Sequence, residues 1–222
     1  MEEHVILVDQ NDNPIGKEEK VKCHLPNGKL HRAFSALIFN NEGKLLLTKR
    51  SDKKMLWPGY WDGTVASHPM ESETYVSSAE RRMPEEIGID CKMNYMNKFE
   101  YHVPYKDIGS ENEICGTLIG IVDDFDETCL IKDEISEIKW IGPDELKNEL
   151  QHKWSAYCPW MILALYFLPP YSEDVSTILG KANEKFSSLI PEQWVERDVP
   201  TYVNAIKHHI PTNNWRLVLP ND

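Results

Sequence analysis

Short runs of hydrophobic residues alternate along the chain with segments in which apolar residues recur at helical spacing. The short runs predict β-strands. These strands cover residues 4–8, 33–40, 44–50, 97–105, 113–122 and 137–141. A turn is predicted over residues 9–14, and Asn41-Glu42-Gly43 predicts the turn of a hairpin between the second and third strands.

Three helices are predicted before residue 170. A polar helix covers residues 73–86, with Gly88 as its stop and Pro84 bending or weakening its last turn. A short helix opens at Pro143. An apolar helix begins at Cys158-Pro159 and ends at the two prolines that follow Leu168.

Beyond Pro170 the spacing of apolar residues predicts an amphipathic helix. Its apolar positions are Val175, Ile178, Leu179, Ala182, Phe186 and Leu189. A second helical stretch is predicted over residues 199–210. Strands mixed with helices, without regular βαβ alternation, predict a mixed sheet flanked by helices, of the α+β class.

Length and charge narrow the class of protein. A chain of 222 residues, 41% of them hydrophobic, can bury one sizeable core. We expect a domain over residues 1–170, with a helical extension over residues 171–222 that caps the site, forms a homodimer interface or completes the core. The net charge of −12 disfavours binding to nucleic acid or to an anionic membrane. The sequence shows no long apolar span and no signal-like N-terminus, so a cytoplasmic location is expected.

Histidines and acidic residues form a candidate metal-binding set. His24 and His31 flank a Pro-Asn-Gly turn, and His68 lies in a later loop. Glu111 and Glu113 are two residues apart, so on an extended chain both point to one face. Three imidazoles and two carboxylates suit a divalent ion such as Mn²⁺, Mg²⁺ or Zn²⁺.

The middle of the chain carries a recognisable layout. Trp57-Pro58-Gly59-Tyr60-Trp61 is followed by Val65-Ala66-Ser67-His68-Pro69 and by a helix that ends at Gly88. This layout resembles type I isopentenyl-diphosphate isomerase, over about residues 3–165. The resemblance implies a Nudix-like fold, in which a mixed sheet is sandwiched by helices. It also implies binding of isopentenyl or dimethylallyl diphosphate and a shift of the double bond by protonation and deprotonation.

The resemblance assigns roles to residues of the candidate site. Family members hold a metal ion with residues that match His24-x₆-His31, His68-Pro69 and Glu111-Asn112-Glu113. Glu113 matches the group that exchanges a proton on one face of the substrate, and Tyr101 matches its hydrogen-bonding support. Trp160 matches the ring that stabilises positive charge on the substrate.

The diphosphate end of the site is implied in the same way. The cations that match the family's diphosphate-binding residues are Lys20, Arg50, Lys54 and Arg82. Glu86 matches a helix glutamate that helps to bind a second ion, Mg²⁺, which bridges the diphosphate. Such an ion would offset the negative charge of the chain.

Several residues depart from the family pattern. Family members read Trp-x-Asn-(Ser/Thr)-x-Cys-x-His-Pro, and this chain has Ala66 at the position of the cysteine. Alanine offers neither a proton nor a hydrogen bond. The residues considered as replacements for the thiol are Ser67, Asp62, Cys23 and Cys158.

The helix also carries part of the Nudix box, which leaves other functions open. Glu73, Arg81 and Glu85-Glu86 have the spacing of the box, but Arg82 stands where Nudix hydrolases place a metal-binding glutamate. The first alternative is a metal-dependent hydrolase of a prenyl or other diphosphate that uses these glutamates. The second alternative is a non-catalytic binder of prenyl diphosphates.

Overall fold

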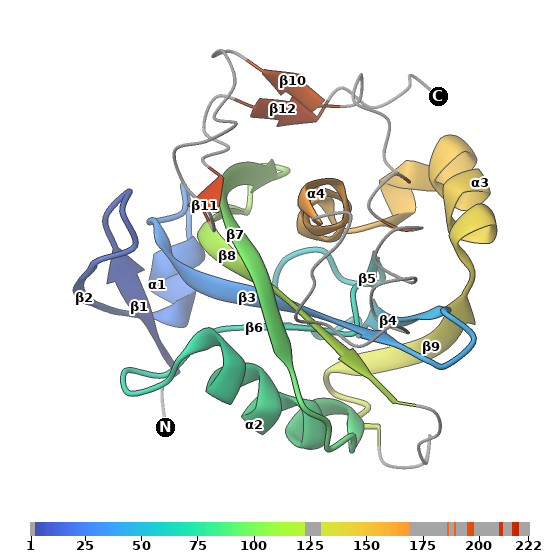
Figure 1. The fold of residues 1–222 in the computed structure, drawn as a ribbon. Coiled ribbons are helices and arrows are strands. Elements are labelled where there is room, and N and C mark those ends of the chain that lie inside the picture. Colours follow the sequence, from blue (N-terminus) through green and yellow to red (C-terminus); the bar gives the residue numbers. More distant parts are fainter. Residues whose placement is uncertain are drawn as a thin grey trace.

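The computed structural model describes residues 3–122 and 130–168, together with Phe186, Leu189 and the backbone of three short later strands. A twisted mixed sheet forms the middle of the molecule (Figure 1). Helix α2 (Tyr75–Ile87) lies on one side of this sheet, and α4 (Pro159–Phe167) and α3 (Pro143–Lys153) lie on the other. Within the described residues, none of the helices has the length and apolar character that crossing a membrane would require.

The sheet is built around two long parallel strands, β3 (His31–Phe39) and β8 (Gly109–Ile121). One path through the sheet has the order β11-β7-β8-β3-β1-β2. Off this path, β4 and β6 pair with β3, and β5 and β9 pair with β4. The remaining strands of the first part of the chain are β1 (His4–Val8), β2 (Pro14–Glu19), β4 (Leu45–Arg50), β5 (Trp61–Asp62), β6 (Val65–Ser67), β7 (Asn94–Tyr105) and β9 (Ile135–Ile141).

Most predicted elements occur, with boundaries shifted by up to four residues. Strand β1 has the predicted bounds, and the hairpin turn after β3 has Gly43 at a φ of 74°. The sequence analysis missed β2, the short helix α1 (Lys20–His24), β5 and β6. Strand β2 lacks the apolar alternation that identifies a half-buried strand, because it lies at the edge and is mostly exposed.

Helix α2 is defined by its end signals. Thr74 accepts a hydrogen bond from the Ser77 N–H in a capping box, and Gly88 ends the helix in the left-handed conformation, at a φ of 71°. The helix continues through Pro84 to Ile87. Its apolar residues, among them Met83, pack against the face of β3 that carries Phe34.

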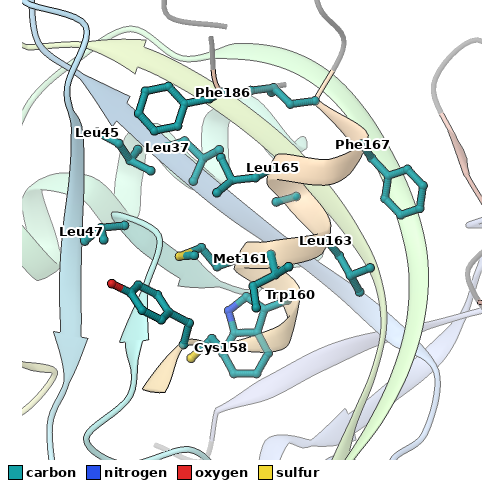
Figure 2. Close-up of a cluster of buried hydrophobic side chains, with 14 of the residues drawn as sticks. Leu37, Leu45, Leu47, Cys158, Trp160, Met161, Leu163, Leu165, Phe167 and Phe186 are labelled. Atoms are coloured by element: carbon teal, nitrogen blue, oxygen red, sulfur yellow. The ribbon is translucent and has the colours of Figure 1, made fainter. Parts of the chain in front are cut away.

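Helix α4 is apolar on every side and is buried against the opposite face of the sheet (Figure 2). Met161 and Leu165 pack toward Leu37 and Leu45, which come from β3 and β4. Because the helix is surrounded by other side chains, its N-terminal residues are held firmly in place. Trp160 is one of these residues, and it lines a cavity together with Glu113 and Tyr101.

The C-terminal part contains strands where helices were predicted. His209–Ile210 forms β11, which pairs in parallel with Lys98 and Phe99 of β7, so the end of the helix predicted over 199–210 is wrong. The open backbone edge of β7 offers hydrogen bonds that the apolar spacing could not reveal. Strands β10 (Val195–Arg197) and β12 (Trp215–Leu217) pair with each other. Of the helix predicted over 175–189, Phe186 is helical, and Phe186 and Leu189 are buried in the core beside α4; the rest lies outside the described residues.

Gly116 offers a test of the packing between α2 and the sheet. A Cβ atom at this position would lie 2.5 Å from the Tyr75 ring, whose hydroxyl is fixed by hydrogen bonds to Asp12 and to the Ile114 carbonyl. We expect Gly116→Ala to reduce the free energy of unfolding by about 1–3 kcal/mol, measured by urea denaturation. Gly16→Ala is the matched control, because nothing lies within 4 Å of its Cβ position. Equal stability of the two variants would contradict this packing.

Candidate active site

Three histidines meet two glutamates at one end of the sheet. His24 ends α1, His31 begins β3 and His68 directly follows β6. One ligand atom from each histidine and one from Glu113 all lie within 4.8 Å of one another. The register of β3 with β8 places His31 opposite Glu113, and Glu111 lies two residues earlier on the same face of β8. The predicted metal-binding residues are therefore close together.

Backbone carbonyl groups determine which histidine nitrogens face this cluster. His24 Nδ1 lies 2.6 Å from the Lys20 carbonyl, and His31 Nδ1 lies 2.8 Å from the Lys29 carbonyl. A carbonyl oxygen only accepts, so in both rings Nδ1 donates its proton and Nε2 is the nitrogen that points into the cluster. Burial, reinforced by the charge of Lys20, holds the pKa of His68 well below its usual range. Neutral imidazoles are the form that binds metals.

With all three imidazoles in their neutral form, the facing atoms of the cluster would be acceptors that repel one another. Glu111 Oε2 is buried without a hydrogen-bond donor, 3.0 Å from His24 Nε2. Glu113 Oε1 lies 3.4 Å from His31 Nε2 and 3.5 Å from His68 Nε2. Burial disfavours a charge on His31, but hydrogen bonds with Cys23 and Glu113 raise its pKa well above its usual range. The cluster therefore favours positive charge at its centre, and its donor set fits a divalent metal ion.

Glu113 is also held by a tyrosine on the neighbouring strand. The Tyr101 hydroxyl donates to Glu113 Oε2 at 2.6 Å, and the two residues pair across β7 and β8. Burial and the nearby carboxylate raise the pKa of Tyr101 well above its usual range, so the hydroxyl keeps its proton. Burial opposes ionisation of Glu113, but His31 and Tyr101 stabilise the carboxylate, and its pKa is lowered.

A cavity of about 250 Å³ opens beside this cluster. Glu113, Tyr101 and Trp160 contribute to its wall, as does Ala66 from β6. Ala66 pairs with Ser35 of β3 in the sheet. The arrangement brings the three predicted catalytic side chains and the position of the absent thiol to one enclosed space, which we call the main cavity.

A second cavity, of about 540 Å³, adjoins the main one and carries most of the predicted diphosphate-binding cations. Lys20 and Lys54 line both cavities, Arg50 lines only the main cavity, and Arg82 lines only the second. Ala66 and His68 lie where the two cavities meet. A ligand that spans both cavities would therefore pass directly over Ala66.

Each of the four predicted cations is paired with a carboxylate. Lys20 pairs with Glu3 at 2.9 Å, and Lys54 pairs with Glu134. Arg50 forms a salt bridge with Asp62, and Arg82 forms salt bridges with Glu85 and Glu86. Because the cations are already neutralised, a diphosphate has to compete with these carboxylates or bring a cation with it.

The helix glutamates of the partial Nudix box are also engaged. Arg81 binds both oxygens of Glu73, and Arg82 donates to Glu85 and Glu86. Burial raises the pKa of Glu86, although Arg82 and Lys54 oppose this change. Glu86 lines the second cavity and is not one of the residues of the histidine cluster.

The four residues considered as replacements for the thiol lie in different environments. Cys23 is buried, with Sγ near the Lys29 carbonyl, and Cys158 is buried as well. Asp62 is buried and fully hydrogen-bonded. Ser67 lines both cavities, and its side chain alternates to the face of β6 opposite Ala66. Asp62 lines a small third pocket, which Ala66 also lines.

Several residues of the cavities were missed by the sequence analysis. Ser35 lines the main cavity, and Glu134 lines both cavities as the partner of Lys54. Ser35 lies within an apolar strand, and Glu134 is about eighty residues from its partner. Only strand register and loop position bring these residues to the site, so no local sequence signal identifies them.

Comparisons with known proteins agree with this architecture. The family model of the NUDIX domain matches residues 29–159. A crystal structure of a Deinococcus radiodurans protein superimposes with a TM-score of 0.60 and covers 73% of this chain and 97% of that one. A MutT NUDIX hydrolase from Burkholderia pseudomallei gives a TM-score of 0.50 and covers 64% and 99%. At 19% and 17% identity, these two structures support the fold alone. The fold is that of a NUDIX domain.

Relatives with higher sequence identity show which family with the NUDIX domain the chain belongs to. The isopentenyl-diphosphate Delta-isomerase of Halobacterium salinarum is 35% identical over 168 residues, which cover 72% of this chain and 78% of that protein. The Haloarcula marismortui isopentenyl-diphosphate Delta-isomerase is 36% identical over 170 residues, which cover 73% and 89%. This chain belongs to the isopentenyl-diphosphate Delta-isomerase family, and the resemblance found in the sequence is confirmed.

Proposed function

We propose that this protein binds isopentenyl or dimethylallyl diphosphate and interconverts the two by moving the double bond. The observation that carries the proposal is the main cavity, where the Glu113–Tyr101 pair and the Trp160 ring enclose one space beside the histidine cluster. Names of the curated relatives support the same substrate class. Binding alone would not require a buried carboxylate that is oriented by a tyrosine beside an aromatic ring, so this arrangement favours an enzyme over a non-catalytic binder.

The proposed chemistry needs a proton added to one alkene carbon and another removed nearby, with positive charge between the two steps. Glu113 exchanges one proton, and the Tyr101 hydroxyl orients its carboxyl group. Trp160 presents to the main cavity an electron-rich ring that stabilises positive charge. Ala66 leaves the other side of the reaction without an acid or base.

Two metal sites accompany the proposal. The donor set of His24, His31, His68, Glu111 and Glu113 fits a divalent ion. When bound, this ion would neutralise the cluster and tune the acidity of Glu113. A second ion, Mg²⁺, at Glu86 would let the diphosphate approach the glutamates of the second cavity.

The diphosphate is assigned to the second cavity and the hydrocarbon to the main one. Lys20, Lys54 and Arg82 line the second cavity, and cations of this kind bind phosphate oxygens. Arg82 takes the position where hydrolases hold metal with glutamate, and it neutralises Glu85 and Glu86. This pairing favours binding of the diphosphate over its hydrolysis.

Introducing a thiol at position 66 is expected to increase turnover. We expect Ala66→Cys to isomerise isopentenyl diphosphate about 10- to 100-fold faster than the unaltered protein, because it restores a proton-exchanging group to the cavity wall. Proton NMR in D₂O, with Mg²⁺ and Zn²⁺ or Mn²⁺ supplied, would follow deuterium entering the product.

The matched control is Ala156→Cys, which adds a thiol away from both cavities and should leave turnover unchanged. Release of phosphate without isomerisation by either protein would favour the hydrolase instead. Tight binding of isopentenyl diphosphate without turnover, even by Ala66→Cys, would favour a non-catalytic binder.

A further inference from the structure

Asp62 is a buried carboxylate that connects two side chains of the main cavity. It lies on β5, is 3% exposed and accepts a hydrogen bond from the Gly63 N–H at 2.7 Å. Trp160 Nε1 donates to the same oxygen at 2.8 Å, and Arg50 Nη1 donates to the other oxygen at 3.3 Å. Trp160 and Arg50 line the main cavity, whereas Asp62 does not. Asp62 lines a small third pocket together with Arg50 and Ala66. Its contacts with the wall of the main cavity are those with Trp160 and Arg50.

The hydrogen bond from the indole N–H to Asp62 determines the orientation of the Trp160 ring. An indole has a single N–H donor, so the partner of that donor fixes how the ring is turned. Trp57 packs against the ring edge to face, with centroids 5.1 Å apart, and Tyr101 lies 6.4 Å away. A carboxylate that accepts from the indole also polarises it and increases the electron density of its face. This density is what attracts a positively charged carbon.

Arg50 places a competing positive charge near the same ring. Its guanidinium carbon lies 5.2 Å from the centre of the Trp160 ring. Its other donors bind the carbonyl oxygens of Leu56 and Trp57, at 2.9 and 3.0 Å, so the side chain is held in place. An uncompensated guanidinium here would repel a second cation in the cavity. The carboxylate of Asp62 offsets this charge.

We propose that Asp62 is a positioning residue that holds the Trp160 indole and offsets the charge of Arg50, so that the main cavity accepts a positively charged carbon beside the ring. The inference rests on the proposed function, because the isomerisation is what creates positive charge on the ligand. The inference concerns how the main cavity binds a positively charged ligand, and it does not make Asp62 the replacement for the absent thiol.

Binding measurements test the inference without requiring turnover. The two probes are isopentenyl diphosphate and a diphosphate of similar size that carries a protonated tertiary amine in place of the alkene carbon. With metal-supplied protein in a calorimeter, we expect Asp62→Asn to weaken binding of the ammonium probe at least about tenfold, and that of isopentenyl diphosphate less than about threefold. Asp62→Glu, which keeps the charge, should restore most of the preference.

Two further variants separate positioning from general loss of structure. Asp12→Asn breaks a comparable buried aspartate–arginine pair, with Arg32, and should leave the ratio of the two affinities unchanged. In a Trp160→Phe background, the effect of Asp62→Asn on the ratio should shrink, because the indole donor is gone. An equal loss for both probes, or an undiminished effect beside phenylalanine, would overturn the inference. Failure of the unaltered protein to bind either probe would overturn the proposed function as well.

Discussion

Replacing Glu113 by glutamine is expected to reduce the rate of isomerisation by roughly a thousandfold or more, within the range that a positioned acid or base contributes. Glutamine keeps the shape of the side chain and can still accept from the Tyr101 hydroxyl, but it cannot exchange a proton at ordinary pH. The rate is measured by deuterium incorporation, in the unaltered protein and in the Ala66→Cys background.

Glu100→Gln is the matched control for this experiment. Glu100 is a buried carboxyl group on β7, next to Tyr101 and on the opposite face of the strand, and it lines neither cavity. Its replacement should leave turnover within about threefold of the starting protein, since surface and structural changes outside the site seldom act on the chemical step. A similar loss in both variants would show that the loss at Glu113 reflects structure rather than proton exchange. Metal content must be measured in each variant, because Glu113 also belongs to the cluster.

Local sequence signals predicted the parts of the fold that local physics decides. Gly88 was predicted as the stop of α2, and α4 was predicted from an apolar segment between prolines. The alternation of a strand was enough to predict that Glu111 and Glu113 share a face. Elements whose structure depends on pairing with a distant strand were not predicted correctly. The edge strand β2 was missed, and β11, which pairs with the open edge of β7, was predicted as part of a helix.

In the candidate site too, the sequence revealed what depends on local spacing and missed what depends on distant contacts. Spacing and family resemblance identified the histidines and glutamates that the fold brings together. The same reasoning described Lys54 and Arg82 as cations and could not reveal that each is paired with a carboxylate. Ion pairing depends on which loops meet in space. The hydrogen bond between Asp62 and Trp160, almost one hundred residues apart in sequence, is of the same kind.

Removing divalent metal is expected to lower the unfolding temperature of the protein. Glu111 Oε2 is buried without a hydrogen-bond donor, 3.0 Å from His24 Nε2, so loss of an ion leaves this oxygen without a positively charged partner. An ion present at a hundred times its dissociation constant contributes about 2.7 kcal/mol to the free energy of unfolding. For a chain of this size that corresponds to a decrease of roughly 5–11 °C, measured by scanning calorimetry before and after treatment with a chelator.

Two histidine variants decide whether this change comes from the cluster. His31→Ala removes a central ligand and should abolish the response to the chelator, together with about one equivalent of bound metal in elemental analysis. His152→Ala removes an exposed histidine on α3 and should leave the response intact. If the unaltered protein contained no metal after supply of Zn²⁺, Mn²⁺ and Mg²⁺, and its unfolding temperature ignored the chelator, the cluster would not be a metal site. Its facing acceptors would then have to be satisfied by protonation of His31, whose pKa the neighbouring Glu113 already raises against the effect of burial.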